Sequence, residues 1–204
     1  MTSVRRIGIY GGTFDPIHIG HLAIAEEARA VLVLDQVLFV PAARQPLKDE
    51  AQGATPIQRL AMARLACAAN SGFAVSDLEL RRPPPSYTVD TLAALRAQVD
   101  LATEIFFIIG ADAACDLPRW YRAAEIIRLV RLAIIGRPGY QIDLADLEAR
   151  LPGIAARATL IDGPRLAISS SDLRARLASG RAARYQIPDP VLAYIERHAL
   201  YREQ

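Results

Sequence analysis

Short apolar runs along this chain alternate with longer stretches in which apolar residues recur three or four positions apart. The longer stretches have the spacing of helices that bury one face, and they lie at 21–32, 57–69 and 91–99. The short runs have the length and composition of buried strands. They are IGIY (7–10), VLFV (37–40), FAV (73–75), IFFII (105–109) and LAII (132–135). Because strands alternate with helices and are almost wholly apolar, the pattern predicts an α/β fold. We expect a Rossmann-like, open, mainly parallel sheet flanked by helices.

The pattern changes near residue 165, after which we predict only helices, at 171–179 and 189–198. Pro188 or Pro190 would lie near the start of the second helix, where proline is tolerated. A length of 204 residues fits one domain. We therefore expect a single domain over 1–204 in which residues from about 165 onward form a small helical C-terminal subdomain.

Composition narrows the class of protein. Apolar residues make up 52% of the chain, enough for a sizeable core, and the formal net charge is only +2, which gives little support to a nucleic-acid-binding protein. Cys67 and Cys115 match no metal or redox spacing and suit a reducing compartment. The first residues lack the apolar core of a signal peptide, and no uncharged apolar run has membrane-spanning length. These features predict a soluble cytoplasmic protein with neither a nucleic-acid nor a membrane partner.

The stretch GGTFDPIHIGHL, which follows the first predicted strand, combines features of a phosphate site. Gly11 and Gly12 would permit a tight turn in which backbone N–H groups approach a ligand. Asp15 followed by Pro16 is typical of a helix start, with a capping carboxylate and then a proline in the first turn.

Two of the three histidines, His18 and His21, lie in this same stretch, three residues apart. On a helix they would share one face of the first turns. The N-terminus of a helix attracts anions, so two imidazoles there could donate hydrogen bonds to phosphate oxygens. A metal site is the alternative, but no carboxylate or cysteine with metal-ligand spacing lies nearby, so we predict no metal held by the protein itself.

A second stretch, AISSSDLRARL (167–177), has the same chemistry. Ser170, Ser171 and Arg174 could form a phosphate cradle at a helix start. Ser169 and Asp172 equally fit a capping box. The residues of this stretch alone do not decide between the two interpretations.

These motifs together resemble the nucleotidyltransferase superfamily of cytidylyltransferases and small-molecule adenylyltransferases. Its signature G-T-F-D-P-I-H-x-G-H matches residues 12–21, and its I-S-S-T-x-I-R motif matches 168–174, with Ser171 and Leu173 in place of Thr and Ile. The resemblance implies that His18 and His21 bind the triphosphate. It further implies that the first turn is lined by Gly11, Gly12, Thr13 and Phe14, and that Ser170, Ser171 and Arg174 hold the β- and γ-phosphates.

Within the superfamily, the chain is most similar to bacterial nicotinate-nucleotide adenylyltransferases. It carries S-Y-T-x-D-T-L at 86–92, F-I-x-G-A-D with L-P-x-W between 107 and 120, and R-P-G-Y at 137–140. For ATP, the resemblance implies contacts of Asp112 with the ribose, of Gly110 through its backbone, and of Arg137 near adenine. For the mononucleotide, it implies that Trp120 stacks on the pyridine ring and that the backbone of Tyr87 and Thr88 meets the ring carboxylate. The family motif P-H-K reads Pro46-Leu47-Lys48 here, which leaves Lys48 as the candidate for the mononucleotide phosphate.

The implied reaction joins ATP and nicotinate mononucleotide into deamido-NAD, with release of pyrophosphate, and uses Mg²⁺ held mainly by phosphates and water. Alternatives are another small-molecule nucleotidyltransferase, acting on phosphopantetheine or glycerol phosphate, and a catalytically silent nucleotide-binding relative. The sequence leaves two questions open: whether the acid or the amide mononucleotide is preferred, and whether the chain forms a homo-oligomer.

Overall fold

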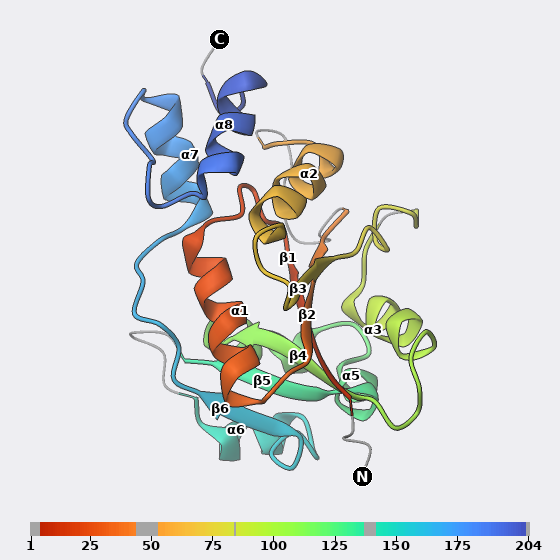
Figure 1. The fold of residues 1–204 in the computed structure, drawn as a ribbon. Helices are drawn as coiled ribbons and strands as arrows, with labels where there is room; N and C mark the ends of the chain where they lie inside the picture. Colours follow the sequence, from red (N-terminus) through yellow and green to blue (C-terminus); the bar gives the residue numbers. More distant parts are fainter. Residues whose placement is uncertain (1–4, 44–52, 84, 137–141, 203–204) are drawn as a thin grey trace. The chain divides into compact units, whose positions relative to one another are not determined.

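The computed structural model describes residues 5–43, 53–83, 85–136 and 142–202, in which strands and helices alternate along most of the chain (Figure 1). In chain order the elements are β1 (Arg6–Gly12), α1 (Ile19–Val31), β2 (Gln36–Pro41), α2 (Pro56–Cys67), β3 (Phe73–Val75), α3 (Thr88–Arg96), β4 (Glu104–Gly110), α4 (Ala111–Asp116), the 3₁₀ turn η1 (Leu117–Arg119), α5 (Ala123–Leu129), β5 (Arg131–Ile135), α6 (Leu144–Arg150), β6 (Ala158–Ile161), α7 (Ser170–Ala178) and α8 (Asp189–Arg197).

The strands form one six-stranded sheet with the order β3-β2-β1-β4-β5-β6. The pairs β1–β4, β4–β5 and β5–β6 are parallel, with Ile9 opposite Phe107 and Phe107 opposite Leu132. The predicted Rossmann-like sheet is therefore confirmed. The strand order reverses between β1 and β4, and in open sheets of this kind ligands bind outside the carboxyl ends of the strands at such a point. β1 ends in the glycine-rich turn and β4 ends at Gly110, so each of these strands leads into one of the predicted motifs.

The chain forms two compact units. The first consists of Met1–Gly11, Ile24–Leu38 and Tyr87–Arg165. Its core is the middle of the sheet, where β4 and β5 are buried almost throughout, and α3 packs against α5 beside it. Strands covered on both faces need apolar side chains at every position, which explains why IFFII and LAII do not alternate with polar residues.

The second unit consists of Gly12–Ala23, Phe39–Ser86 and Leu166–Gln204. In it α2 packs against α8, and α7 lies beside α8 (Figure 1). The buried side chains come from all three segments and include Phe14, Phe39, Met62, Leu173 and Val191. The two C-terminal helices thus share a core with the turn after β1 and with α2.

Helix boundaries follow local capping more closely than apolar spacing. Helix α2 begins at Pro56 because the side chain of Thr55 accepts a hydrogen bond from the Gln58 N–H while Gln58 bonds back to Thr55. The sequence analysis missed α4, α5, α6 and β6, which have only four to seven residues each. A helix of fewer than two turns does not display a readable apolar period.

In the part of the chain that the structure describes, no helix combines the length and the apolar character needed to cross a membrane.

The centre of the sheet should dominate stability. Ile134 is fully buried in β5, and its register partner in β6, Leu160, is 48% exposed. We expect Ile134→Ala to lower the free energy of unfolding by about 2–5 kcal/mol, because it removes buried methyl groups and leaves a cavity. The matched variant Leu160→Ala should cost less than about 1 kcal/mol. Urea unfolding monitored by circular dichroism measures both, and equal losses would contradict this account of the core.

The two cysteines should differ in reactivity. Burial raises the pKa of the Cys67 thiol to about 12, whereas Cys115 is partly exposed. Because the thiolate is the reactive form, Cys67 should stay protonated and unmodified in the folded protein at pH 8. Titration with an aromatic disulfide reagent should therefore find one reactive thiol in the native chain and two after denaturation. Rapid modification of both native thiols would show that Cys67 is accessible.

Candidate functional site

The turn after β1 is closed by the ring of Phe14. A Cβ atom on Gly12 would lie 2.9 Å from that ring, so only glycine fits beneath it. Phe14 has a positive φ of 53°, which is costly for a bulky side chain, yet its ring is 2% exposed and packs edge-on against His21 at 5.1 Å. Burial of the ring offsets this strain. The next peptide bond, Asp15–Pro16, is cis.

The two histidines of the motif lie together, as their spacing predicts. Their rings stack with centroids 3.7 Å apart at an angle of 24°. His21 Nδ1 accepts a hydrogen bond from the backbone N–H of His18 at 3.2 Å, so a neutral His21 ring carries its proton on Nε2. A Cβ on Gly20 would lie 3.1 Å from the His18 ring, so the glycine between the histidines makes room for this arrangement. His21 can therefore donate from Nε2 without being charged.

The prediction that Asp15 caps the first helix is wrong. Helix α1 begins four residues later, at Ile19, whose N–H donates to the Gln186 carbonyl at 3.0 Å. The Asp15 carboxylate instead accepts from the Ala54 N–H at 3.0 Å and from the hydroxyl of Tyr201. The backbone N–H groups of His18 and Ile19 are thus already bonded within the protein, and the imidazole donors become the more important ones for an anion.

The second motif, at the start of α7, lies against the first. The Ser170 hydroxyl donates to the Pro16 carbonyl at 3.0 Å, and Arg174 Nη1 donates to the Asp15 carbonyl at 2.7 Å. Ser169 caps the helix by accepting from the Asp172 N–H, and Arg174 Nη2 lies 3.5 Å from the Ser171 hydroxyl. The two sequence interpretations are therefore compatible, because Ser169 serves as the cap while Ser170 and Arg174 reach the histidine turn.

Sequence analysis missed Arg59, whose guanidinium donates a hydrogen bond to the backbone of this turn. Arg59 is 2% exposed and donates to the carbonyls of Thr13 at 2.8 Å, Ala42 at 2.6 Å, Ala43 at 3.0 Å and Ala54 at 3.2 Å. It joins the glycine-rich turn, the segment after β2 and the segment before α2. An arginine at an apolar helical position was the only available signal, and its partners cannot be read from spacing.

The first unit holds a separate group of predicted residues at the end of β4. Gly110 precedes α4, and a Cβ on it would lie 2.7 Å from Asp112 Oδ1, so the Asp112 carboxylate folds back over this glycine. Substitution of Gly110 would displace that carboxylate. The position of the Asp112 side chain therefore depends on the absence of a side chain at Gly110, the first residue of the motif G-A-D.

Two other predicted segments of the first unit also lie together. The rings of Tyr87 and Tyr121 are 4.6 Å apart, and Arg122 pairs with Asp90 at 3.8 Å. These contacts join the start of α3, where Tyr87 precedes Thr88, to the residues after Trp120. Trp120 is partly exposed, and its ring lies 6.3 Å from that of Phe107 in β4.

Lys48 and Arg137 lie outside the described residues, as do Pro46 and Leu47, so their roles stay predictions. Among the residues that are described, no three His, Cys, Asp or Glu side chains gather in a way that could hold a metal ion.

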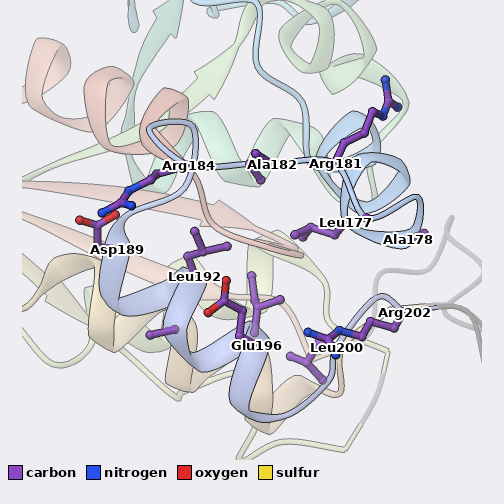
Figure 2. Close-up of a pocket in the computed structure, with 14 residues that line it drawn as sticks. Leu177, Ala178, Arg181, Ala182, Arg184, Asp189, Leu192, Glu196, Leu200 and Arg202 are labelled. Carbon is purple, nitrogen blue, oxygen red and sulfur yellow. The ribbon is translucent and has the colours of Figure 1, made fainter.

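A hollow of about 780 Å³ lies between α7 and α8 of the second unit (Figure 2). Its apolar lining includes Leu177, Leu192 and Leu200, and arginines such as Arg181 and Arg202 also line it. Of the predicted site residues that the structure describes, none lines this hollow. Helix α7 therefore presents Arg174 to the histidine turn and Leu177 to the hollow.

The comparisons with known proteins agree with these motifs. The family model described as cytidylyltransferase-like matches residues 9–176. A probable nicotinate-nucleotide adenylyltransferase of Roseiflexus sp. (strain RS-1) is 56% identical over 96% of this chain and 98% of its own length. A second probable nicotinate-nucleotide adenylyltransferase, from Roseiflexus castenholzii, is 54% identical over 99% of this chain and 100% of its own length. The solved structure of Plasmodium falciparum nicotinic acid mononucleotide adenylyltransferase complexed with NaAD has the same fold, with a TM-score of 0.79 over 97% of both chains at 22% identity.

Loss of the Arg59 guanidinium should be costly. Arg59→Met would leave four backbone carbonyls without their donor, and we expect the free energy of unfolding to fall by about 3 kcal/mol or more. Arg64, on the same helix, is 58% exposed and pairs with Asp77 at 3.6 Å. The control Arg64→Met should therefore change stability by less than about 1 kcal/mol. Denaturant titrations of the two variants decide the matter, and similar losses would count against a special role of Arg59.

Proposed function

Because this chain belongs to the cytidylyltransferase-like family and, within it, to the nicotinate-nucleotide adenylyltransferases, we propose that it transfers the adenylyl group of ATP to nicotinate mononucleotide. The products are deamido-NAD and pyrophosphate, in a step of NAD biosynthesis. The observation that supports this most directly is the stacked pair His18 and His21, with the His21 tautomer set by a backbone N–H and with Arg174 bonded to the same turn.

In the proposed reaction, a phosphate oxygen of the mononucleotide attacks the α-phosphorus of ATP. A new P–O bond forms, the bond from the α-phosphorus to the bridging oxygen of the β-phosphate breaks, and pyrophosphate leaves with that electron pair. A phosphate monoester already carries a charge of about −1.5 to −2 at pH 7, so the nucleophile needs no general base. Catalysis then consists of aligning two anions and stabilising the charge that develops on the leaving group.

The described residues suit this task. His21 donates from Nε2 to a phosphate oxygen, and the ring of His18 holds it in place by stacking. Arg174 and Ser170 are fixed to the turn by the carbonyls of Asp15 and Pro16 and supply a positive charge and a hydroxyl beside it. Because these contacts fix the positions of the groups, less ordering is needed in the transition state.

The remaining assignments are part of the same proposal. Asp112, folded over Gly110, would bind the ribose of ATP, and Arg137 would lie near adenine. The backbone of Tyr87 and Thr88 would meet the pyridine carboxylate, and the partly exposed ring of Trp120 would stack on the pyridine. Lys48 would bind the phosphate of the mononucleotide. These roles rest on the family motifs.

Mg²⁺ would enter with ATP and be held mainly by phosphate oxygens and water, because this ion usually keeps several waters and needs few protein carboxylates. At the turn, Oδ1 of Asp15 already accepts hydrogen bonds from Ala54 and Tyr201. When bound, the ion would neutralise charge on the leaving pyrophosphate.

The test is pyrophosphate release with ATP and Mg²⁺, comparing nicotinate mononucleotide with nicotinamide mononucleotide. We expect preference for the acid, because backbone N–H groups bind a carboxylate better than a carboxamide. His18→Ala should lower kcat by roughly 100-fold or more, because it removes the ring that holds the His21 donor in place, and loss of one donor to transition-state charge typically costs that much. The control is His198→Ala, which removes an exposed histidine after α8 and should leave the rate unchanged.

Equal use of both mononucleotides would overturn the account of the pyridine pocket but leave adenylyl transfer intact. Release of pyrophosphate with phosphopantetheine but with neither mononucleotide would show that the chain transfers the adenylyl group to a different acceptor. No release with any acceptor, together with tight ATP binding, would favour the silent nucleotide-binding alternative.

A further inference from the structure

Asp15 connects three distant parts of the second unit. It is 8% exposed, and its Oδ1 accepts hydrogen bonds from the Tyr201 hydroxyl at 2.6 Å and from the Ala54 N–H at 3.0 Å. A Cβ on Gly53 would clash with its Oδ2, so the chain before α2 packs directly on the carboxylate. Arg174 Nη1 bonds to the Asp15 backbone carbonyl at 2.7 Å but stays 3.8 Å from Oδ2.

Arg174 therefore contacts the backbone of Asp15 closely and the carboxylate only loosely. A close arginine–carboxylate pair would have bonds near 2.8 Å. The loose pair leaves much of the guanidinium charge available to an anion at the turn. The two donors to Oδ1, of which the Tyr201 hydroxyl is the closer, fix the orientation of the carboxylate and so hold Oδ2 at 3.8 Å from Arg174 Nη1.

Tyr201 is a permanent donor in this position. Burial, with the negative charge and hydrogen bond of Asp15, raises the pKa of the Tyr201 hydroxyl well above its ordinary value, so the group keeps its proton. Its neighbours Leu200 and Arg202 line the hollow between α7 and α8, where Figure 2 labels both. The residues after α8 thus contribute both to the lining of that hollow and, through the hydroxyl of Tyr201, to the contacts of Asp15. Tyr201 also has a positive φ of 63°, a conformation that the surrounding contacts must maintain.

We propose that Tyr201 is a positioning residue for ATP: by holding the Asp15 carboxylate, it keeps the Arg174 guanidinium directed to the triphosphate. This rests on the proposed function only in taking ATP as the ligand of the histidine turn. Without the hydroxyl, the carboxylate turns toward Arg174 and forms a close ion pair. The arginine then offers less charge to the β- and γ-phosphates, while the mononucleotide residues are unaffected.

The test compares Tyr201→Phe with Tyr194→Phe. The control removes a hydroxyl from another tyrosine of the same region, whose ring lies against His198. We expect Tyr201→Phe to raise the KM for ATP and the Kd of ATP by about three- to tenfold, the range for the net contribution of a typical hydrogen bond. The KM for nicotinate mononucleotide should stay within about twofold, and Tyr194→Phe should change none of these constants.

A second measurement separates positioning from mere stabilisation. If Tyr201 acts through Asp15 on Arg174, Tyr201→Phe should add less than about twofold to the ATP Kd in an Arg174→Lys background. Full additivity would overturn the proposal. So would an unchanged Kd for ATP in Tyr201→Phe, or a parallel loss of Tm and of affinity for both substrates. Calorimetric binding of ATP needs no acceptor, so these outcomes remain readable even if the proposed transfer to nicotinate mononucleotide fails.

Discussion

The buried guanidinium of Arg59 is the contact on which the histidine turn depends. A charged group in the interior is tolerated only when its donors are satisfied, and Arg59 meets this demand with four backbone carbonyls. Those carbonyls belong to three loops that have no regular structure of their own. Because burying the charge without these hydrogen bonds would be costly, each loop must stay where its carbonyl reaches the guanidinium.

Asp15 adds a second buried charge, of opposite sign, to the same turn. Its carboxylate and carbonyl together contact the segment before α2, α7 and Tyr201. The turn that carries Phe14 and the stacked histidines is therefore fixed both by the hydrogen bonds of Arg59 and by those of Asp15. These contacts from both sides account for how the positive φ of Phe14 is maintained.

The sequence revealed the sheet because its strands must be apolar at nearly every position. IGIY, VLFV, FAV, IFFII and LAII all lie within observed strands. It did not reveal β6, where only Ile161 is buried, or the short helices α4–α6. The start of α3 at Thr88, three residues before the predicted one, was also missed, because apolar spacing does not mark the first turn of a helix.

For the site, the local relationships were predictable and the distant ones were not. The pairing of His18 with His21 follows from a spacing of three, and the cap at Ser169 follows from local chemistry. Asp15 was misread as a cap because its true partners lie 39 and 186 residues away. Arg59 and Tyr201 carry no motif, since what they do depends entirely on tertiary contacts.

The separation of Asp15 from Tyr201 also sets an order of events during synthesis. The ribosome adds about 5–20 residues per second, so the 186 residues between them take roughly 10 to 40 s to make. During that time the glycine-rich turn and its histidines already exist, but neither α7 nor Tyr201 does. A nascent chain can thus pair its first strands before α7 and Tyr201 exist, so the histidine turn acquires its full set of contacts only after those distant residues have been made.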